Sequence, residues 1–172
     1  MEIREVRPEE YDEVGRALIA AYDEFATPGD SGWEEHKRLM ADVAGRVDRT
    51  MVLVAAEKGR VLGSATIEMD RTIGDDDREL PPDVAALRML GVIPEARGRG
   101  VGRALVQATI ERCRLRGKRE LILRTTERMV TAQKLYRAMG FERDPKRDMR
   151  FEDGFVLYAY RLDLVPTNRQ KS

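Results

Sequence analysis

The 172-residue sequence has few of the side chains that build disulfides and metal centres. Its one cysteine, Cys113, excludes an internal disulfide, and one cysteine with one histidine, His36, is too few for a zinc site. Cys113 is interpreted as a helix packing residue. His36 lies in the polar stretch Glu-Glu-His-Lys-Arg and is interpreted as a surface residue. We therefore expect no metal cofactor.

Long apolar runs are also missing. None approaches the roughly 18 residues of a membrane-spanning helix, and the acidic start Met-Glu-Ile-Arg-Glu-Val is not that of a signal peptide. With no feature for export or membrane insertion, the expected location is the reducing cytoplasm. The length suits a single domain, expected over residues 1–165, followed by a flexible C-terminal tail at 166–172.

Several nucleotide and catalytic motifs are absent as well. There is no Gly-Lys-Ser/Thr step of a nucleoside triphosphate loop and no Gly-x-Ser-x-Gly elbow.

Residues 88–147 hold 16 Lys or Arg against 6 Asp or Glu, and such a basic half suits a polyanion. A nucleic-acid binder would interleave aromatic with basic residues, but no Phe, Tyr or Trp lies between Arg97 and Arg128. Nucleic acid is therefore the weaker candidate for that polyanion.

A glycine-rich run is the most informative feature that is present. It consists of Arg97, Gly98, Arg99, Gly100, Val101, Gly102 and Arg103. An apolar run ending at Pro94 predicts a buried strand before it, and an apolar stripe with helical spacing begins at Val101. The order strand, glycine turn, helix leaves unpaired N–H groups at the helix start, where a phosphate binds well. Taken alone, the run is equally compatible with a plain turn that holds no ligand.

A second block of sequence strengthens the phosphate interpretation. A β-rich segment at 121–126 precedes a stripe with helical spacing that includes Tyr136 and stops at Gly140. The pair Arg-Gly-Arg-Gly-Val-Gly-Arg-Ala-Leu and Ala-Gln-Lys-Leu-Tyr-Arg-Ala-Met-Gly-Phe closely resembles the GNAT acetyltransferase superfamily. The first block is similar to its acetyl-CoA pyrophosphate loop and the second to its tyrosine helix. The resemblance covers about residues 51–164.

The resemblance implies an α/β (α+β) fold, the GNAT acyl-CoA N-acyltransferase fold. Its central sheet is mixed and mostly antiparallel, has six to seven strands with strands four and five splayed, and is flanked by about four helices. The implied activity is transfer of the acetyl group of acetyl-CoA to a primary amine, on a small molecule or a protein, by direct attack in a ternary complex. The implied coenzyme contacts are Leu90, Gly91 and Val92 together with the glycine-rich run.

The order of elements read along the sequence fits this fold. The expected elements are a strand at 2–6, a helix from Pro8 toward Phe25, a helix at 33–47, a hairpin of strands at 51–57 and 61–69, the two blocks above, and strands from Phe141 and from Phe155 to Leu164.

Two side chains are candidates for proton transfer. Tyr136 occupies the family's tyrosine position, which implies a general acid for the departing thiolate, with simple packing as the alternative. The family's glutamate position falls on Ala86, which cannot take a proton. Glu68 is the nearest substitute, because strand alternation places it on one face with Ser64 and Thr66. A solvated strand end is the alternative role for Glu68.

The acceptor is defined least. In the family the first two helices wall the acceptor pocket, and here that segment supplies Tyr22, Phe25 and Trp33. The acidic loop at 75–79 either attracts a cationic amine or is simply solvated. The expected partners are acetyl-CoA and an amine acceptor, with no nucleic acid and no membrane, and a homodimer stays open. An acyl-CoA sensor without catalysis is the alternative function, which Ala86 favours and Tyr136 opposes.

Overall fold

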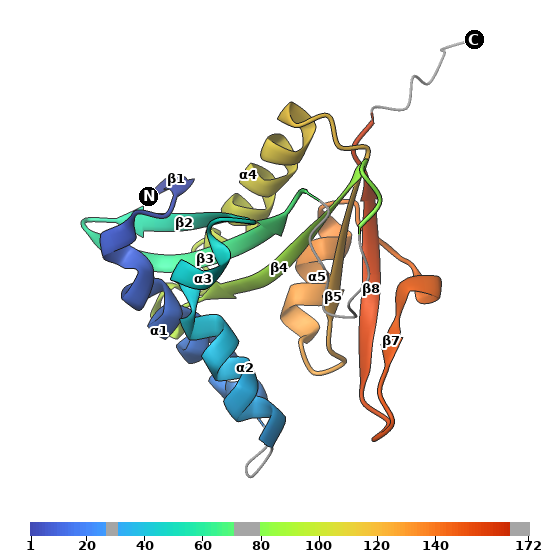
Figure 1. Ribbon diagram of the computed structural model, residues 1–172, viewed down its shortest axis with the longest axis horizontal. Coiled ribbons are helices and arrows are strands. Elements are labelled where there is room, and N and C mark those ends of the chain that lie inside the picture. The colour runs from blue at the N-terminus through green and yellow to red at the C-terminus, as the bar shows by residue number, and fades with distance from the viewer. Residues whose placement is uncertain (27–30, 71–79, 166–172) are drawn as a thin grey trace.

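An eight-stranded sheet forms the centre of the fold. The computed structural model describes residues 1–26, 31–70 and 80–165 (Figure 1). Its strands are β1 (Glu2–Glu5), β2 (Met51–Glu57), β3 (Arg60–Glu68), β4 (Val84–Val92), β5 (Glu120–Thr125), β6 (Glu142–Arg143), β7 (Met149–Arg150) and β8 (Val156–Asp163). Their order is β1-β2-β3-β4-β5-β8-β6 with β7 paired to β8, and every pair is antiparallel except β4 with β5.

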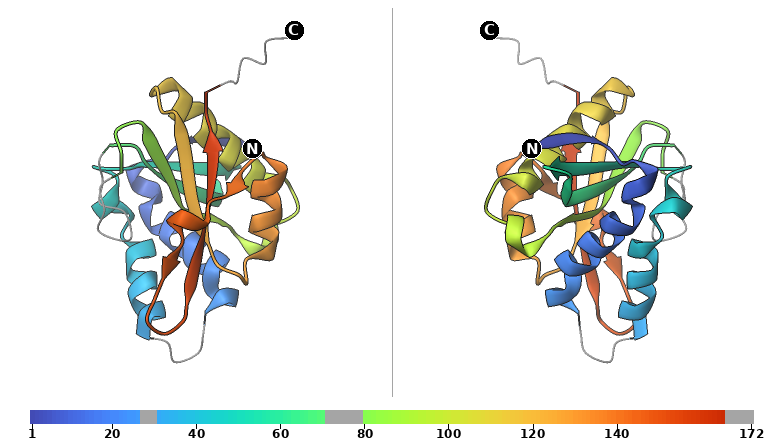
Figure 2. Two further views of the ribbon diagram at one scale, coloured as in Figure 1. Left: turned by 90° about the vertical axis from the view of Figure 1, so that its right-hand side faces the viewer. Right: turned by 90° about the vertical axis from the view of Figure 1, so that its left-hand side faces the viewer.

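Helices cover both faces of this sheet. The α-helices of the described residues are α1 (Tyr11–Tyr22), α2 (Ser31–Ala41), α3 (Val43–Arg46), α4 (Val101–Leu115) and α5 (Val130–Ala138). Short 3₁₀ turns at Pro8–Glu10 and Asp23–Phe25 extend α1 at its two ends. In both views of Figure 2, α2 (cyan) and α5 (orange) lie on opposite sides of the sheet.

Two neighbouring residues of β4 show which helix packs on which face. A Cβ added to Gly91 would lie 3.0 Å from side-chain atoms of both Leu18 and Ala21, so Gly91 faces α1. Val92 faces the other way, because its Cγ2 atom would lie 3.7 Å from a Cβ added to Gly102 at the start of α4. Consecutive strand residues point to opposite faces. The two faces of β4 are therefore packed against α1 and against α4.

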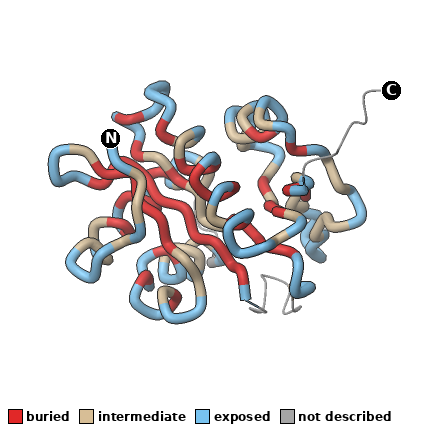
Figure 3. Tube along the Cα trace, turned by 90° about the horizontal axis from the view of Figure 1, so that it is seen from above, coloured by how far each residue is buried: buried red, intermediate tan, exposed pale blue. Residues whose placement is uncertain are grey.

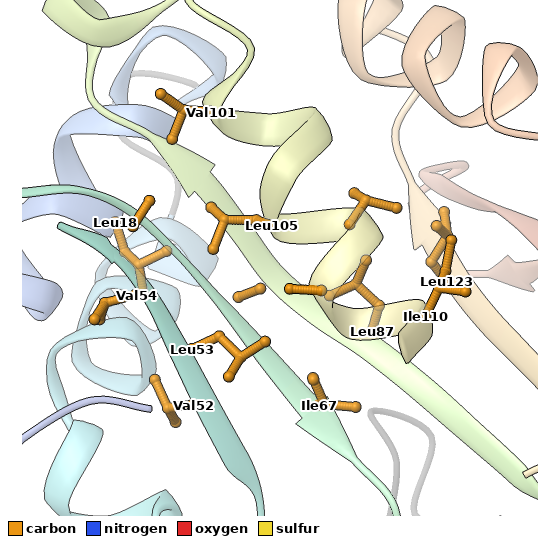
Figure 4. Close-up of a cluster of buried hydrophobic side chains, with 14 of the residues drawn as sticks. Leu18, Val52, Leu53, Val54, Ile67, Leu87, Val101, Leu105, Ile110 and Leu123 are labelled. Carbon is orange, nitrogen blue, oxygen red and sulfur yellow. The ribbon is translucent and has the colours of Figure 1, made fainter. Parts of the chain in front are cut away.

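The apolar core lies along the central strands. Buried residues concentrate there, as the red segments of Figure 3 show. Leu105 of α4 belongs to one apolar cluster with Leu53, Ile67 and Leu87 of three neighbouring strands (Figure 4), and all four side chains are buried. Full burial of one such side chain contributes roughly 1.5–3 kcal/mol to stability, so this layer holds α4 firmly against the sheet.

A bulge in β4 separates it from β5. The parallel ladder joins Val84–Leu87 to Glu120–Leu123, and the rest of β4 does not pair with β5. Met89 has a left-handed φ of 48°, and two β4 residues, Met89 and Leu90, occupy the place opposite the single residue Ala65 of β3. A bulge bends its strand and increases the local twist. As a result β4 and β5 start together and diverge as the two arms of a V (Figure 1).

The predicted fold class is confirmed, including the mixed, mostly antiparallel sheet. The strand number exceeds the expected six to seven because β6 and β7 are separate two-residue strands. The single helix predicted at 33–47 is wrong. Asp42, with ψ at 64°, leaves the helical region, and its carboxylate accepts a hydrogen bond from the Gly45 N–H at 3.0 Å, so a second helix begins there.

Three expectations fall wholly or partly outside the described residues: the tail at 166–172, the acidic loop at 75–79, and most of the loop expected between the first two helices. Within the described residues, no helix has the length and apolar character needed to cross a membrane.

Candidate functional site

The glycine-rich run forms a tight turn that opens α4. Gly98 and Gly100 have φ values of 75° and 77°, in the left-handed region that glycine adopts at least cost. A Cβ at either position would meet nothing within 4 Å, so the backbone angle rather than crowding selects glycine there. Gly100 is the N-cap and offers no side-chain cap. The amides of the first helical turn, at 101–103, therefore point outward without intrahelical partners and form a site for an anion.

The three arginines of the run have different surroundings. Arg97 bonds the Ala21 carbonyl at 3.1 Å and pairs with Glu24 at 2.5 Å, which ties the turn to the end of α1. Arg99 pairs with Glu57, the last residue of β2, at 2.8 Å. Arg103 is exposed and makes no ion pair within 1–26, 31–70 or 80–165. Of the three, it is the cation best placed to meet an incoming anion.

The backbone of Leu90, Gly91 and Val92 lies where β4 has left β5. The Leu90 carbonyl accepts a hydrogen bond of 2.8 Å from the Tyr22 hydroxyl. Burial raises the pKa of Tyr22 to about 12, so this phenol stays protonated and continues to donate at neutral pH. The sequence-predicted pocket residue Tyr22 thus contacts one of the predicted coenzyme residues directly.

Tyr136 of α5 is buried among aromatic rings. It is 6% exposed, and its ring lies 5.7 Å from that of Phe141 and 6.2 Å from that of Tyr160. Burial raises its pKa far above the ordinary value, and the nearby Tyr22 adds to the rise. Tyr136 therefore takes part in packing and also keeps its proton, so its surroundings suit both roles considered for it.

Glu68 lies directly opposite Ala86 in the β3–β4 ladder. It is 3% exposed, so it is not a solvated strand end. Its Oε1 atom accepts a hydrogen bond of 2.6 Å from Arg88, while its buried Oε2 atom has no hydrogen-bond partner among the described residues. Neighbours across a ladder project on the same face of the sheet. The carboxylate of Glu68 thus projects beside Ala86.

A charged cavity adjoins Glu68 on the face covered by α2 and α3. Its volume is about 420 Å³. It is lined by Leu39, Asp42, Arg46, Arg49, Thr50, Thr66, Glu68, Asp70, Arg88 and Met89. Because Met89 belongs to the β4 bulge, the cavity extends to the point where β4 leaves β5. No group of three or more His, Cys, Asp or Glu residues in the described part of the chain could hold a metal ion.

Two of the predicted pocket aromatics contact His36, a residue that sequence reasoning assigned wrongly. Tyr22, Phe25 and Trp33 are all half-buried. The ring of His36 lies 5.9 Å from that of Tyr22 and 6.1 Å from that of Trp33. His36 is therefore a half-buried member of an aromatic cluster and not a surface residue. Burial and the positive charge of Arg88 lower the pKa of His36 below 6.5.

Arg46 and His36 were missed, although their spacing signals their position. His36 follows Trp33 by three residues and precedes the buried Met40 by four, and Arg46 follows the buried Val43 by three. Those offsets lie on one helix face. The same periodicity that located the apolar stripes therefore places both charged or titratable side chains on inward faces.

Comparison with known proteins gives consistent matches. The model of the acetyltransferase (GNAT) family matches residues 14–141. A mycothiol acetyltransferase from Cellulomonas flavigena is 31% identical over 115 residues, which are 64% of this chain and 33% of that protein. The chain therefore spans about a third of that relative's length.

Solved structures share the fold. A putative GNAT acetyltransferase from Desulfovibrio desulfuricans superposes with a TM-score of 0.73 at 20% identity, covering 95% of this chain and 99% of that one. A putative acetyltransferase from Salmonella typhimurium, solved with its cofactor acetyl-CoA, gives 0.68 at 21% identity, covering 96% and 95%.

The surroundings of His36 lead to a pH prediction. We expect the lone histidine of a tag-free sample to titrate below pH 6.5, and the Arg88→Met variant to raise that pKa because a neighbouring positive charge is removed. At a pH between the pKa of His36 in the folded chain and its pKa in the unfolded chain, the imidazole carries its proton mainly in the unfolded chain. The free energy of unfolding should therefore fall as the pH drops through this window and be unaffected above about pH 6.5. Proton NMR of the imidazole C2–H measures the pKa, and a value above 6.5 would contradict this burial.

Proposed function

Because the family model covers most of the chain, this protein belongs to the acetyltransferase (GNAT) family, and we propose that it transfers the acetyl group of acetyl-CoA to a primary amine by direct attack in a ternary complex. The observation that carries the proposal is the combination of an outward-facing helix start with a strand freed from its neighbour by a bulge. The first suits a pyrophosphate, and the second leaves backbone groups available for an extended thioester arm.

The glycine-rich run fits the phosphates of acetyl-CoA. The amides at the start of α4 have no helical acceptors, and Arg103 stands exposed beside them without an ion-pair partner in the described ranges. Arg97 and Arg99 add positive charge while their bonds to Glu24 and Glu57 hold the turn in place. In this proposal the first turn of α4 binds the pyrophosphate and Arg103 neutralises it.

Acetyl-CoA supplies the acetyl group as an activated thioester. The backbone of Leu90, Gly91 and Val92 would orient it and stabilise the negative charge that develops on its carbonyl oxygen, as preorganised backbone donors do. Tyr136 would donate its proton to the departing thiolate. The raised pKa of its buried phenol supports this role, because a general acid must carry its proton at neutral pH.

Glu68 is our candidate for accepting the proton of the amine. Its buried position opposite Ala86 supports the assignment, as does its Oε2 atom, which has no hydrogen-bond partner among the described residues. Arg88 holds the other oxygen at 2.6 Å and so fixes the orientation of the carboxylate. Glu68 lies four residues beyond Ser64, the ladder partner of Gly91, which is about 13 Å along the strand. A chain of water molecules would therefore relay the proton between the amine and Glu68.

Coenzyme binding is tested by reversing one charge. In an Arg103→Glu variant the new carboxylate would repel the pyrophosphate, and we expect the Kd for acetyl-CoA to rise at least about tenfold, the loss expected for one charge-assisted hydrogen bond. An Arg116→Glu variant reverses a charge at the opposite end of α4 and serves as the control. Isothermal titration calorimetry measures the Kd of both variants. Equal affinities would show that the pyrophosphate does not bind at this turn.

The acid role of Tyr136 is tested by deleting its hydroxyl. Tyr136→Phe should lower kcat on the order of 10²–10⁴-fold, the usual contribution of a general acid, with acetyl-CoA affinity retained. Tyr160→Phe is the matched control, because it removes a hydroxyl from the same aromatic cluster, one that bonds Gln133 at 3.0 Å. Thiol release from acetyl-CoA with a panel of amines gives the rates. A kcat within about threefold of that of the unmodified protein would show that Tyr136 only packs and is not the general acid.

The base role of Glu68 is tested through pH dependence. If Glu68 accepts the proton, Glu68→Gln should weaken or abolish the acidic limb of the kcat/KM profile, since that limb reports the free enzyme's base. Asp70→Asn, a nearby exposed carboxylate, is the control. Two amines with different pKa values should be compared. A limb that follows the pKa of the amine and survives in Glu68→Gln would exclude Glu68.

A further inference from the structure

Arg46 is a buried cation with no anionic partner in the described part of the chain. It is 7% exposed. Its Nε atom donates to the Thr66 hydroxyl at 3.3 Å, and its Nη1 atom donates to the Leu39 and Met40 carbonyls at 2.8 and 3.2 Å. Its Nη2 atom is buried and bonds nothing among those residues. Burying a charged group without a salt bridge is unfavourable, and the negative charge of Asp42 offsets the effect of burial on the pKa of Arg46 only in part.

Arg46 forms no salt bridge with the described carboxylates around it. Asp42 caps α3 through the Gly45 N–H at 3.0 Å and forms no ion pair with Arg46. Glu68 is held by Arg88 at 2.6 Å. Burial nevertheless lowers the pKa of Arg46 only to about 10, so the guanidinium is charged at neutral pH. Of the three arginines that line the cavity, Arg88 is paired with Glu68, Arg49 is exposed to solvent, and Arg46 is buried without a salt bridge among the described residues.

A structural role explains part of Arg46 but not all of it. Two of its three nitrogens donate hydrogen bonds to carbonyls in the last turn of α2 and to one strand hydroxyl. A positive charge near the C-terminus of a helix is also favourable. The third nitrogen has no such partner and belongs to a side chain that lines the 420 Å³ cavity. That volume lies within the usual range of small-molecule pockets.

We propose that the acceptor is a small amine that also carries a carboxylate, of the amino-acid type, and that Arg46 binds this carboxylate. The assignment rests on the acetyl transfer proposed above. Thr66, which Arg46 contacts, lies opposite Arg88, one residue before the Met89 bulge. The same cavity is lined by Met89 of the bulge, so an amino acid whose carboxylate binds Arg46 would have room to place its amino group toward the point where β4 has parted from β5.

The charge of the cavity selects a carboxylate over a phosphate. Its lining holds three basic residues, Arg46, Arg49 and Arg88, and three acidic ones, Asp42, Glu68 and Asp70. The three carboxylates would repel a doubly charged phosphate more strongly than a singly charged carboxylate, and Arg46 is the one buried arginine of the lining that has no salt bridge among the described residues. A zwitterion, which brings one charge of each sign, leaves the balance of the cavity unchanged.

The test compares matched pairs of amines. The probes are the common free amino acids and the carboxamide of each, with thiol release from acetyl-CoA as the readout. We expect kcat/KM to favour the best free amino acid over its own amide by on the order of 10²-fold, in the range measured for losing one partner of a buried charge pair. In Arg46→Gln, which retains hydrogen-bonding capacity, this ratio should fall toward one. Arg38→Gln, an exposed arginine on α2, should keep it.

The outcomes separate this inference from the proposed function. Equal rates with free amino acids and amides in the unmodified protein would overturn the carboxylate site and leave acetyl transfer standing. A preference that Arg46→Gln preserves would also overturn it. If no amine of any kind accelerates thiol release although acetyl-CoA binds, acetyl transfer itself fails and the carboxylate site fails with it. Thermal stabilisation by the preferred amino acid, present in the unmodified protein and lost in Arg46→Gln, gives a readout that needs no turnover.

Discussion

The parting of β4 from β5 is the constraint on which the rest of the site depends. A parallel ladder that continued past Leu87 would consume the backbone groups of the next five residues, and the bulge at Met89 prevents that. The cost is local, because β4 keeps its antiparallel partner β3 on both sides of the irregularity. One left-handed residue is thus enough to turn part of a central strand into a surface that can bind a ligand through main-chain atoms.

The features predicted from sequence were those that periodicity and glycine chemistry determine. The turn before α4 and the alternation that places Glu68 beside Thr66 both follow from side-chain patterns. The bulge could not be found this way, since an extra residue in an apolar strand leaves composition unchanged and its effect appears only against the register of β3. The break at Asp42 was missed because a single residue with non-helical ψ interrupts an otherwise continuous polar and apolar pattern.

His36 was assigned wrongly and Arg46 was missed because residue type was given more weight than spacing. His36 stands among charged neighbours, and an arginine is expected at the surface, yet both side chains lie on inward helix faces. The fold tolerates them because each meets suitable groups: aromatic rings around His36, and carbonyl oxygens around Arg46. Arg46 therefore lines the charged cavity, whereas His36 belongs to the aromatic cluster of Tyr22 and Trp33. The roles of Tyr136 and Glu68 remain predictions that their buried surroundings support.

The last turn of α1 supports two distant parts of the molecule at once. Its Ala21 carbonyl and the following Glu24 hold Arg97 of the glycine-rich turn, while the Tyr22 hydroxyl holds the Leu90 carbonyl of β4. The glycine-rich turn and β4 are thus both held by the C-terminal end of α1. The glycine-rich turn and the Leu90 segment of β4 therefore cannot shift relative to each other unless the end of α1 moves as well.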